Sequence, residues 1–157
     1  MLTAIKNSKI DITSEKSTRE LAEKLTSYLK GGEYIFLHGE MGVGKTTFVK
    51  YFINKLQTDE KLKLTEVTSP TFNLLNEYET NNFTIKHYDL FRIKNTSEIK
   101  DLDIFEKNEK FITLVEWPQL LKNSNRAQSI DLLFSYENEL KNRTVQIEGL
   151  NSFFVKC

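Results

Sequence analysis

Apolar residues along the chain recur with two periods, one typical of buried strands and one typical of helices. Continuous apolar or β-branched runs at 34–37 and 111–115 predict strands that are buried on both faces of a sheet. Two longer stretches place apolar residues on one side of a helix. These helical stripes are Leu21, Leu25 and Leu29, and then Phe48, Val49, Phe52, Ile53 and Leu56. Strands that alternate with helices indicate an α/β domain.

Two local signals mark the ends of the first helix. Ser17 to Glu20 has the S-x-x-E spacing of a capping box, in which side chains satisfy the free backbone amides at a helix start. Gly31 and Gly32 favour a stop, because glycine readily adopts the left-handed conformation that ends many helices. We therefore predict a first helix that begins at Ser17 and ends before Gly31.

The other segments predict further strands and short connections. Pairs of β-prone runs separated by a few polar residues are typical of hairpins. The predicted segments are an edge strand at 2–12, hairpins at 73–79 with 83–88 and at 130–136 with 143–150, a charged connector at 57–63 and a short surface helix at 96–106. Together they predict a three-layer α/β domain with a mixed sheet, parallel at its centre and with antiparallel hairpins at its sides.

Length and charge limit the classes of protein to which the chain can belong. Its 157 residues suit a single domain, 1–157, with one core. The 22 basic and 22 acidic residues cancel, so the chain lacks a general positive field for nucleic acid or an anionic membrane. The N-terminal residues lack the apolar run of a signal peptide or membrane span, and the lone Cys157 excludes an internal disulfide. We expect a cytoplasmic protein without membrane or DNA contacts.

The strand at 34–37 leads into the strongest motif of the chain. From Gly39 the sequence is G-E-M-G-V-G-K-T, which matches the P-loop pattern G-x-x-x-x-G-K-[ST] at every fixed position. Glycines allow the backbone to approach a phosphate chain closely and to adopt positive φ. The helix that follows directs its free amides and the positive end of its dipole to the same place. The motif predicts a P-loop NTPase-like domain that binds a nucleotide.

Each residue type in this loop has an expected task. Lys45 supplies positive charge to the β- and γ-phosphates, and we expect it to act in catalysis. The Thr46 hydroxyl is expected to bind the Mg²⁺ that accompanies the nucleotide, and Thr47 extends the phosphate contacts. The predicted nucleotide-binding residues of the loop are Gly39, Glu40, Met41, Gly42, Val43, Gly44, Lys45, Thr46 and Thr47.

A P-loop enzyme also needs an acidic residue at the end of a neighbouring strand to help hold the metal ion. Glu116 fits this requirement, because it follows directly after the apolar run at 111–115. A solvated glutamate at a strand end is the simpler alternative. The position is more often aspartate, and glutamate reaches one methylene further.

Three other polar residues are candidates for the reaction. Asp89 follows the β-prone run at 83–88, which we expect to lie beside the P-loop strand, and its carboxylate could orient the attacking water as a general base. A helix cap or a surface pair with Arg92 explains Asp89 equally well. Thr71 could sense the γ-phosphate, although a turn-forming threonine is the simpler interpretation. His87 is better explained as a half-buried strand residue.

Missing motifs narrow the choice of nucleotide and reaction. No glycine follows an aspartate by three positions, and residues 54–57 lack the acid of an N-K-x-D guanine-binding motif, so ATP is favoured over GTP. A small-molecule kinase needs several arginines in a lid over the transferring phosphoryl group. The arginines of the chain are Arg19, Arg92, Arg126 and Arg143. A slow ATPase that depends on a partner is the more consistent interpretation.

Four motifs, taken in order, resemble those of the TsaE family, also called YjeE, of P-loop ATPases. They are G-E-M-G-V-G-K-T-T-F from Gly39, S-P-T-F-N-L from Ser69, H-Y-D-L-F-R from His87 and L-V-E-W-P from Leu114. The resemblance runs from about Ser17 to Arg143. The last three motifs together are far more specific than the P-loop alone.

The function implied by this resemblance is that of a bacterial ATPase needed to make N6-threonylcarbamoyladenosine in tRNA. Such a protein docks on a complex of TsaD and TsaB, does not itself transfer the threonylcarbamoyl group, and meets tRNA mainly through that complex. ATP and Mg²⁺ are the implied cofactors. By motif position, Thr46 and Glu116 are the implied Mg²⁺ ligands, and Glu15 and Asn142 are the implied nucleotide contacts outside the P-loop.

The resemblance also favours functional parts for Asp89, as an essential acidic residue, and for Thr71. The chain departs from the family pattern at two places: Phe91 stands where tyrosine is common, and residues 98–105 lack a glycine that the family usually shows. From the residues alone, a small-molecule kinase and a nucleotide-gated binding module with negligible hydrolysis stay as alternatives.

Overall fold

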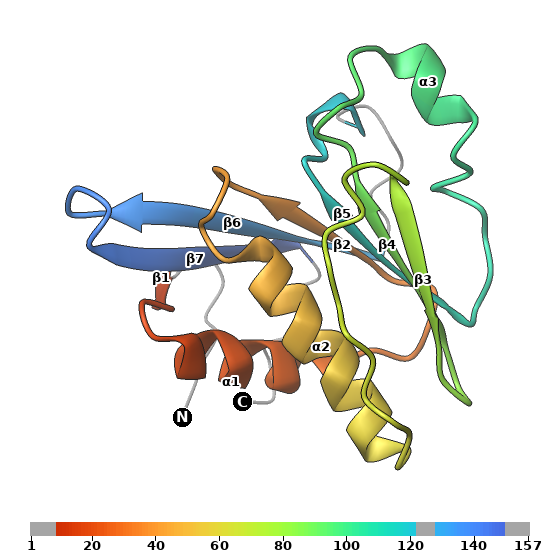
Figure 1. Ribbon diagram of the computed structural model, residues 1–157, viewed down its shortest axis with the longest axis horizontal. Coiled ribbons are helices and arrows are strands. Elements are labelled where there is room, and N and C mark those ends of the chain that lie inside the picture. Colours follow the sequence, from red (N-terminus) through yellow and green to blue (C-terminus); the bar gives the residue numbers. More distant parts are fainter. Residues whose placement is uncertain (1–8, 122–127, 150–157) are drawn as a thin grey trace.

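The computed structural model describes residues 9–121 and 128–149, which build one seven-stranded sheet with helices (Figure 1). The strand order across the sheet is β1-β7-β6-β2-β5-β4-β3. The strands are β1 (Lys9–Asp11), β2 (Tyr34–His38), β3 (Leu75–Glu79), β4 (Thr84–Asp89), β5 (Phe111–Glu116), β6 (Ser129–Glu137) and β7 (Asn142–Gly149). The helices are α1 (Glu15–Thr26), α2 (Lys45–Asp59), α3 (Thr96–Lys100) and the 3-10 helix η1 (Gln119–Leu121).

The strands at the centre of the sheet run parallel. β2 pairs in parallel with β5 and β6, and β4 continues the parallel set beyond β5. β3 pairs antiparallel with β4, while β7 pairs antiparallel with β6 and β1. The predicted α/β fold, with a parallel centre and antiparallel hairpins at its sides, is confirmed.

One neighbour relation differs from the prediction. β4, which ends at Asp89, was expected beside the P-loop strand, but β5 lies between β4 and β2. The sequence explains the exchange, because β5 is almost wholly apolar up to Glu116 and takes the place that is buried on both sides. β4 carries Lys86 and His87 and lies one position further from the centre.

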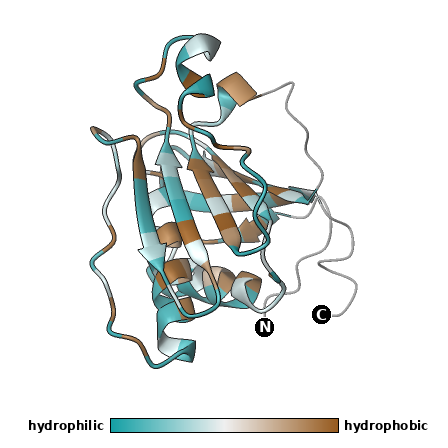
Figure 2. Cartoon of the chain, turned by 90° about the vertical axis from the view of Figure 1, so that its right-hand side faces the viewer, coloured by the Kyte–Doolittle hydropathy of each residue, from teal (hydrophilic) through white to brown (hydrophobic). Residues whose placement is uncertain are grey.

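Alternation along the strands divides the apolar side chains between two cores. On one face α1 and α2 cover the sheet, and their apolar stripes pack against residues such as Ile35 and Leu37 (Figure 1). On the other face a smaller cluster around Phe36 and Val115 is covered by the segment 99–105 and η1. In Figure 2 the central strands are largely hydrophobic, whereas the edge strand β3 is mostly hydrophilic. Side chains on the sheet face that α2 covers are therefore the ones that can contact the first residues of α2.

The helix α1 begins and ends earlier than predicted. Its N-cap is Ser14, whose hydroxyl accepts a hydrogen bond from the Ser17 N–H at 3.1 Å. The predicted capping box at Ser17 is wrong, because the buried Ile12 fixes the chain just before Ser14 and Ser17 already lies in the first helical turn. The helix ends at Thr26 rather than near the glycines, since the next amides bond to carbonyls three residues back and tighten the last turn.

Two other boundaries also shift. α2 continues to Asp59, into the connector predicted at 57–63, because the buried Gln57 side chain hydrogen-bonds the loop that follows the helix. Of the helix predicted at 96–106, only the first five residues are helical. Asp103 adopts φ 51°, a left-handed conformation that a continuing helix does not permit.

Two predicted strands reach the limits of the described residues. Of the edge strand predicted at 2–12, residues 9–11 form β1 and residues 2–8 lie outside the described part. Leu150, the predicted last residue of the final hairpin, also lies outside it. Within 9–121 and 128–149, no helix is long and apolar enough to cross a membrane.

The cap of α1 generates a stability prediction. Replacing Ser14 by alanine removes the acceptor for the Ser17 amide and should lower the free energy of unfolding by about 1 kcal/mol. Ser17→Ala is the matched control and should cost only a few tenths of that, because its exposed hydroxyl contacts just the cap. Urea unfolding followed by circular dichroism measures both, and a larger loss for Ser17→Ala would contradict the assignment of the cap.

Candidate functional site

The chain leaves the core at the end of β2 and enters α2 through a loop of glycines. Gly39, Gly42 and Gly44 adopt positive φ of 146°, 81° and 117°. A Cβ atom at Gly39 would lie 2.8 Å from the Phe134 carbonyl oxygen, so a larger residue does not fit there. Gly44 is the N-cap of α2 and has no side chain to cap the helix, which leaves the first amides available to an anion.

Lys45 is almost fully buried at the mouth of this loop. Its ammonium group donates to the Gly39 carbonyl oxygen at 2.5 Å and lies 3.5 Å from the centre of the Trp117 ring. Burial lowers the pKa of Lys45, and the nearby carboxylates of Glu116 and Asp89 oppose that shift. Trp117 adopts φ 58°, a costly conformation for a bulky residue that here brings the indole over the ammonium group. The Lys45 ammonium group is thus held at the mouth of the loop by a backbone carbonyl and an aromatic ring, neither of which carries the full negative charge of a phosphate.

Thr46 and Glu116 meet directly in front of the P-loop. Glu116 is the last residue of β5 and pairs in register with Leu37 of β2, two residues before the loop begins at Gly39. The Thr46 hydroxyl lies 3.2 Å from each oxygen of the Glu116 carboxylate. One of these oxygens also hydrogen-bonds His87 at 2.6 Å. Glu116 is 3 % exposed, so it is not the solvated strand-end residue of the simpler interpretation.

The chemistry of this pair suits a magnesium ion. A threonine hydroxyl and a carboxylate are hard oxygen donors of the kind that Mg²⁺ prefers, and Mg²⁺ usually takes few protein ligands together with phosphate oxygens and water. In the described part of the chain, no group of three or more His, Cys, Asp or Glu residues could hold a metal ion by itself. A nucleotide would therefore supply part of the coordination.

Asp89 lies at the end of β4, in register with Glu116. Its carboxylate accepts hydrogen bonds from the Ser69 hydroxyl at 2.6 Å and from the Phe91 N–H at 3.0 Å. The Ser69 hydroxyl oxygen lies 3.1 Å from that of Thr71. Because Ser69 donates its own proton to Asp89, the Thr71 hydroxyl is the donor in this second hydrogen bond. The carboxylate therefore anchors the loop before β3 and is not a surface partner of arginine.

Most of the residues described above line one cleft of about 310 Å³. Five separate parts of the chain contribute to it: the P-loop with the start of α2, the loop before β3, the end of β4, the end of β5, and the start of β7. Its lining residues are Met41, Gly42, Gly44, Lys45, Thr46, Thr47, Ser69, Thr71, Asp89, Phe91, Glu116, Trp117 and Arg143. The fold thus brings the predicted catalytic and metal-binding residues together in one place.

Some predicted nucleotide contacts do not line this cleft. Glu40 is exposed, and its carbonyl accepts from the Val43 amide, while the Val43 side chain is buried in the main core. Glu15 lies in the first turn of α1, where its carboxylate hydrogen-bonds Tyr51 and raises the pKa of that phenol. Asn142 is the first residue of β7, beside the cleft residue Arg143.

Sequence reasoning missed Ser69 and Arg143 and treated His87 as a strand residue without a partner. Arg143 donates to the Thr13 carbonyl oxygen at 2.7 Å, and another nitrogen of its guanidinium lies 3.8 Å from the position of a Cβ at Gly44. Adjacent residues of a strand point to opposite faces, so choosing Arg143 over its neighbour Asn142 required the register of β7. Only the pairing of distant strands supplies that information.

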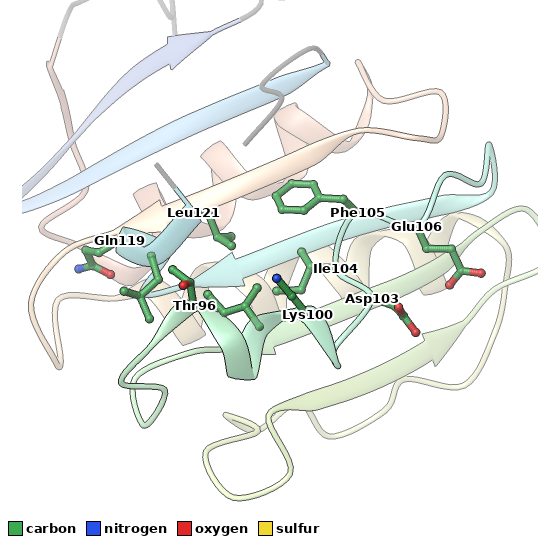
Figure 3. A pocket seen from close by; sticks show the side chains of 10 residues that line it. Thr96, Lys100, Asp103, Ile104, Phe105, Glu106, Gln119 and Leu121 are labelled. Carbon is green, nitrogen blue, oxygen red and sulfur yellow. The ribbon is translucent and has the colours of Figure 1, made fainter. Parts of the chain in front are cut away.

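A larger hollow of about 960 Å³ lies on the other face of the sheet, under α3 and η1 (Figure 3). It combines the apolar Ile104, Phe105 and Leu121 with Lys100 and Asp103 at its edge. None of the predicted site residues lines it. The chemistry expected from the sequence therefore belongs to the smaller cleft at the P-loop.

Comparison with known proteins agrees with the motifs that surround this cleft. A sequence model of the family described as "Threonylcarbamoyl adenosine biosynthesis protein TsaE" matches residues 12–145. The chain is 38% identical over 112 residues to the tRNA threonylcarbamoyladenosine biosynthesis protein TsaE of Rickettsia felis, covering 71% of this chain and 63% of that protein. It is 38% identical over 122 residues to the protein of that name from Aquifex aeolicus, covering 78% and 85%. For the Bacillus subtilis protein the identity is 32% over 119 residues, covering 75% and 71%.

The matched part therefore spans just under two thirds of the length of the Rickettsia felis protein. Among solved structures, the fold is similar to that of Bacillus subtilis YdiB, with a TM-score of 0.69 and 20% identity, over 93% of this chain and 88% of that one. At this identity the likeness concerns the fold alone. The family match covers most of the chain and includes all four motifs whose residues meet around the cleft. The chain belongs to the TsaE family.

Proposed function

We propose that this protein binds ATP with Mg²⁺ and hydrolyses it slowly, as an accessory factor in the biosynthesis of threonylcarbamoyladenosine in tRNA. The observation that carries this function is the meeting of Lys45, Thr46, Glu116 and Asp89 at the start of α2, in a member of the TsaE family. The relatives named above are called tRNA threonylcarbamoyladenosine biosynthesis proteins. This reaction would take place in the cytoplasm.

The side chains that line the cleft have different roles in the proposed reaction. The loop amides and Lys45 bind the β- and γ-phosphates, for which the ammonium group exchanges its contact with the Gly39 carbonyl. Thr46 and Glu116 hold the Mg²⁺, which neutralises charge on the phosphates. Asp89 orients the attacking water and accepts its proton. Thr71 senses the γ-phosphate, and its hydroxyl is connected to Asp89 through Ser69.

Exposed apolar side chains around the cleft support dependence on a partner. Phe72 is 84 % exposed, Met41 66 % and Phe91 46 %, and the last two line the cleft. Large exposed apolar residues that gather at a site are typical of protein contacts. We infer that a complex of TsaD and TsaB covers this side of the molecule. The balanced charge of 22 basic and 22 acidic residues fits tRNA binding that occurs mainly through that complex.

The alternative of a small-molecule kinase has less support. Such an enzyme brings several arginines to the transferring phosphoryl group. Among the described residues, Arg19 pairs with Glu23, and Arg92 lies over the ring of Phe72. Arg143 is the one arginine that lines the cleft within 9–121 and 128–149. A binding module without hydrolysis differs from our proposal only in the release of phosphate.

The contact between Lys45 and Trp117 provides a direct test of nucleotide binding. Trp117 is the only tryptophan of the chain, so its fluorescence should change when Mg-ATP draws the ammonium group off the indole. Lys45→Met should weaken ATP binding about 10- to 100-fold, the value of a hydrogen bond to a charged group. Lys50→Met, an exposed change on the same helix, is the control and should bind as the wild type does. Equal affinities for all three proteins would contradict this role of Lys45.

The role of Asp89 generates a prediction about turnover. Asp89→Asn preserves the shape of the side chain but removes the proton acceptor, so phosphate release should fall at least about 100-fold while ATP affinity changes little. Multiple-turnover modification of tRNA by a reconstituted TsaD and TsaB mixture should be lost in parallel. Asp101→Asn, at the exposed end of α3, is the control. Wild-type turnover by Asp89→Asn would refute the proposed function.

A further inference from the structure

His87 has no part in the function described so far, yet its position in the fold is unusual for a polar residue. It is 0 % exposed, and its Nε2 atom lies 2.6 Å from a Glu116 carboxylate oxygen. Its Nδ1 atom is the only buried side-chain nitrogen or oxygen in the described part of the chain that lacks a hydrogen-bond partner. Most buried polar groups in native proteins have a hydrogen-bond partner, so this imidazole needs an explanation.

The surroundings of His87 would accept an apolar residue. On β4 it follows Ile85 on the face covered by α2, and in the next strand it pairs in register with Leu114. Both neighbours are fully buried in the main core. An imidazole among these apolar side chains buries two nitrogen atoms, of which only one has a hydrogen-bond partner. Burying the other nitrogen lowers the stability of the core relative to an apolar residue. Among the residues that the structure describes, the one hydrogen bond that the imidazole makes in return is that to Glu116.

That hydrogen bond restrains a side chain which otherwise has freedom to turn. Glutamate has one more rotatable bond than aspartate, so a glutamate that binds a metal ion needs more help to keep one orientation. His87 holds one carboxylate oxygen from the neighbouring strand, and the carboxylate then presents both oxygens to the Thr46 hydroxyl at 3.2 Å.

The hydrogen-bond pattern also selects the form of the imidazole. A carboxylate only accepts, so Nε2 carries the proton that is donated to Glu116. Nδ1 then keeps a lone pair without a partner, which is tolerated more readily in a protein interior than an unpaired N–H group.

We propose that His87 is a positioning residue: its Nε2–H group fixes the Glu116 carboxylate in the orientation that Mg²⁺ binding requires. This inference rests on the proposed function, because it concerns how the metal ligand of that site is oriented. His87 is buried and touches neither the nucleotide nor the metal ion. Through Glu116 it nevertheless controls how much Mg²⁺ strengthens nucleotide binding.

The test measures ATP affinity by titration calorimetry, once in EDTA and once in excess Mg²⁺. His87→Met fills the space without a donor, and His87→Gln places an amide donor at the reach of Nε2. We expect the factor by which Mg²⁺ strengthens ATP binding to fall about 10-fold or more in His87→Met and less than threefold in His87→Gln, as for other residues that orient metal ligands. Affinity in EDTA should change less than threefold in both variants.

Lys86→Met is the matched control, because Lys86 is a buried polar residue of the same strand that points to the opposite face and pairs with Glu106. It should keep the full effect of Mg²⁺. The inference is overturned if His87→Met also keeps that effect, or if His87→Gln or Lys86→Met loses as much as His87→Met. If the wild type binds ATP equally with and without Mg²⁺, the proposed metal site itself fails, which is a different result.

A second measurement needs no change at His87. The chain contains only two histidines, so a long-range proton–nitrogen NMR spectrum of the wild type resolves both rings, and a His38→Gln variant assigns them. We expect His87 with its proton on Nε2 and that proton shifted downfield by the carboxylate. A proton on Nδ1 with a bare Nε2 would overturn the inference even if no His87 variant folds.

Discussion

The parallel pairing of β2 with β5 is the constraint on which the rest of the site depends. It sets Glu116 in register with Leu37, so that the carboxylate emerges where the P-loop begins. α2 packs on the same face of the sheet through residues such as Phe48, which carries the Thr46 hydroxyl to the carboxylate. A register shift of one residue would turn Glu116 to the face of Val115, away from α2. The position of the proposed metal ligand therefore follows from backbone hydrogen bonds.

Polar groups in this region are buried, and each depends on the others for compensation. Lys45, Asp89 and Glu116 are each at most 5 % exposed and lie around one cleft. The two carboxylates oppose the effect of burial on the pKa of the Lys45 ammonium group, and His87 and Thr46 bond one of them. Since an unpaired charge in a low-dielectric interior is costly, the arrangement is stable only as a group. The proposed nucleotide with its cation would exchange these contacts for others rather than add charge to an apolar site.

The parts of the site that were predictable from sequence are those that depend on neighbours in the chain. The P-loop needs only the spacing of its glycines and Lys45, and Glu116 follows from an apolar run that ends in an acid. The partner of His87 is 29 residues away, and Arg143 reaches the cleft only through the register of β7, so neither could be found without the strand order. The N-cap of α1 was misplaced for a related reason: Ser14 and Ser17 both fit locally, and burial of Ile12 decides between them.

Trp117 links the nucleotide cleft to the exposed apolar side chains around it. One face of its indole lies 3.5 Å from the Lys45 ammonium nitrogen, and its ring centre is 4.9 Å from that of Phe91, which is 46 % exposed. A nucleotide that draws Lys45 off the indole removes a contact of the same ring that packs against Phe91. Coupling between two sites requires an element that both contact in different ways. Trp117 has the contacts that such an element needs, because the Lys45 ammonium group lies over its indole and Phe91 packs against the same ring.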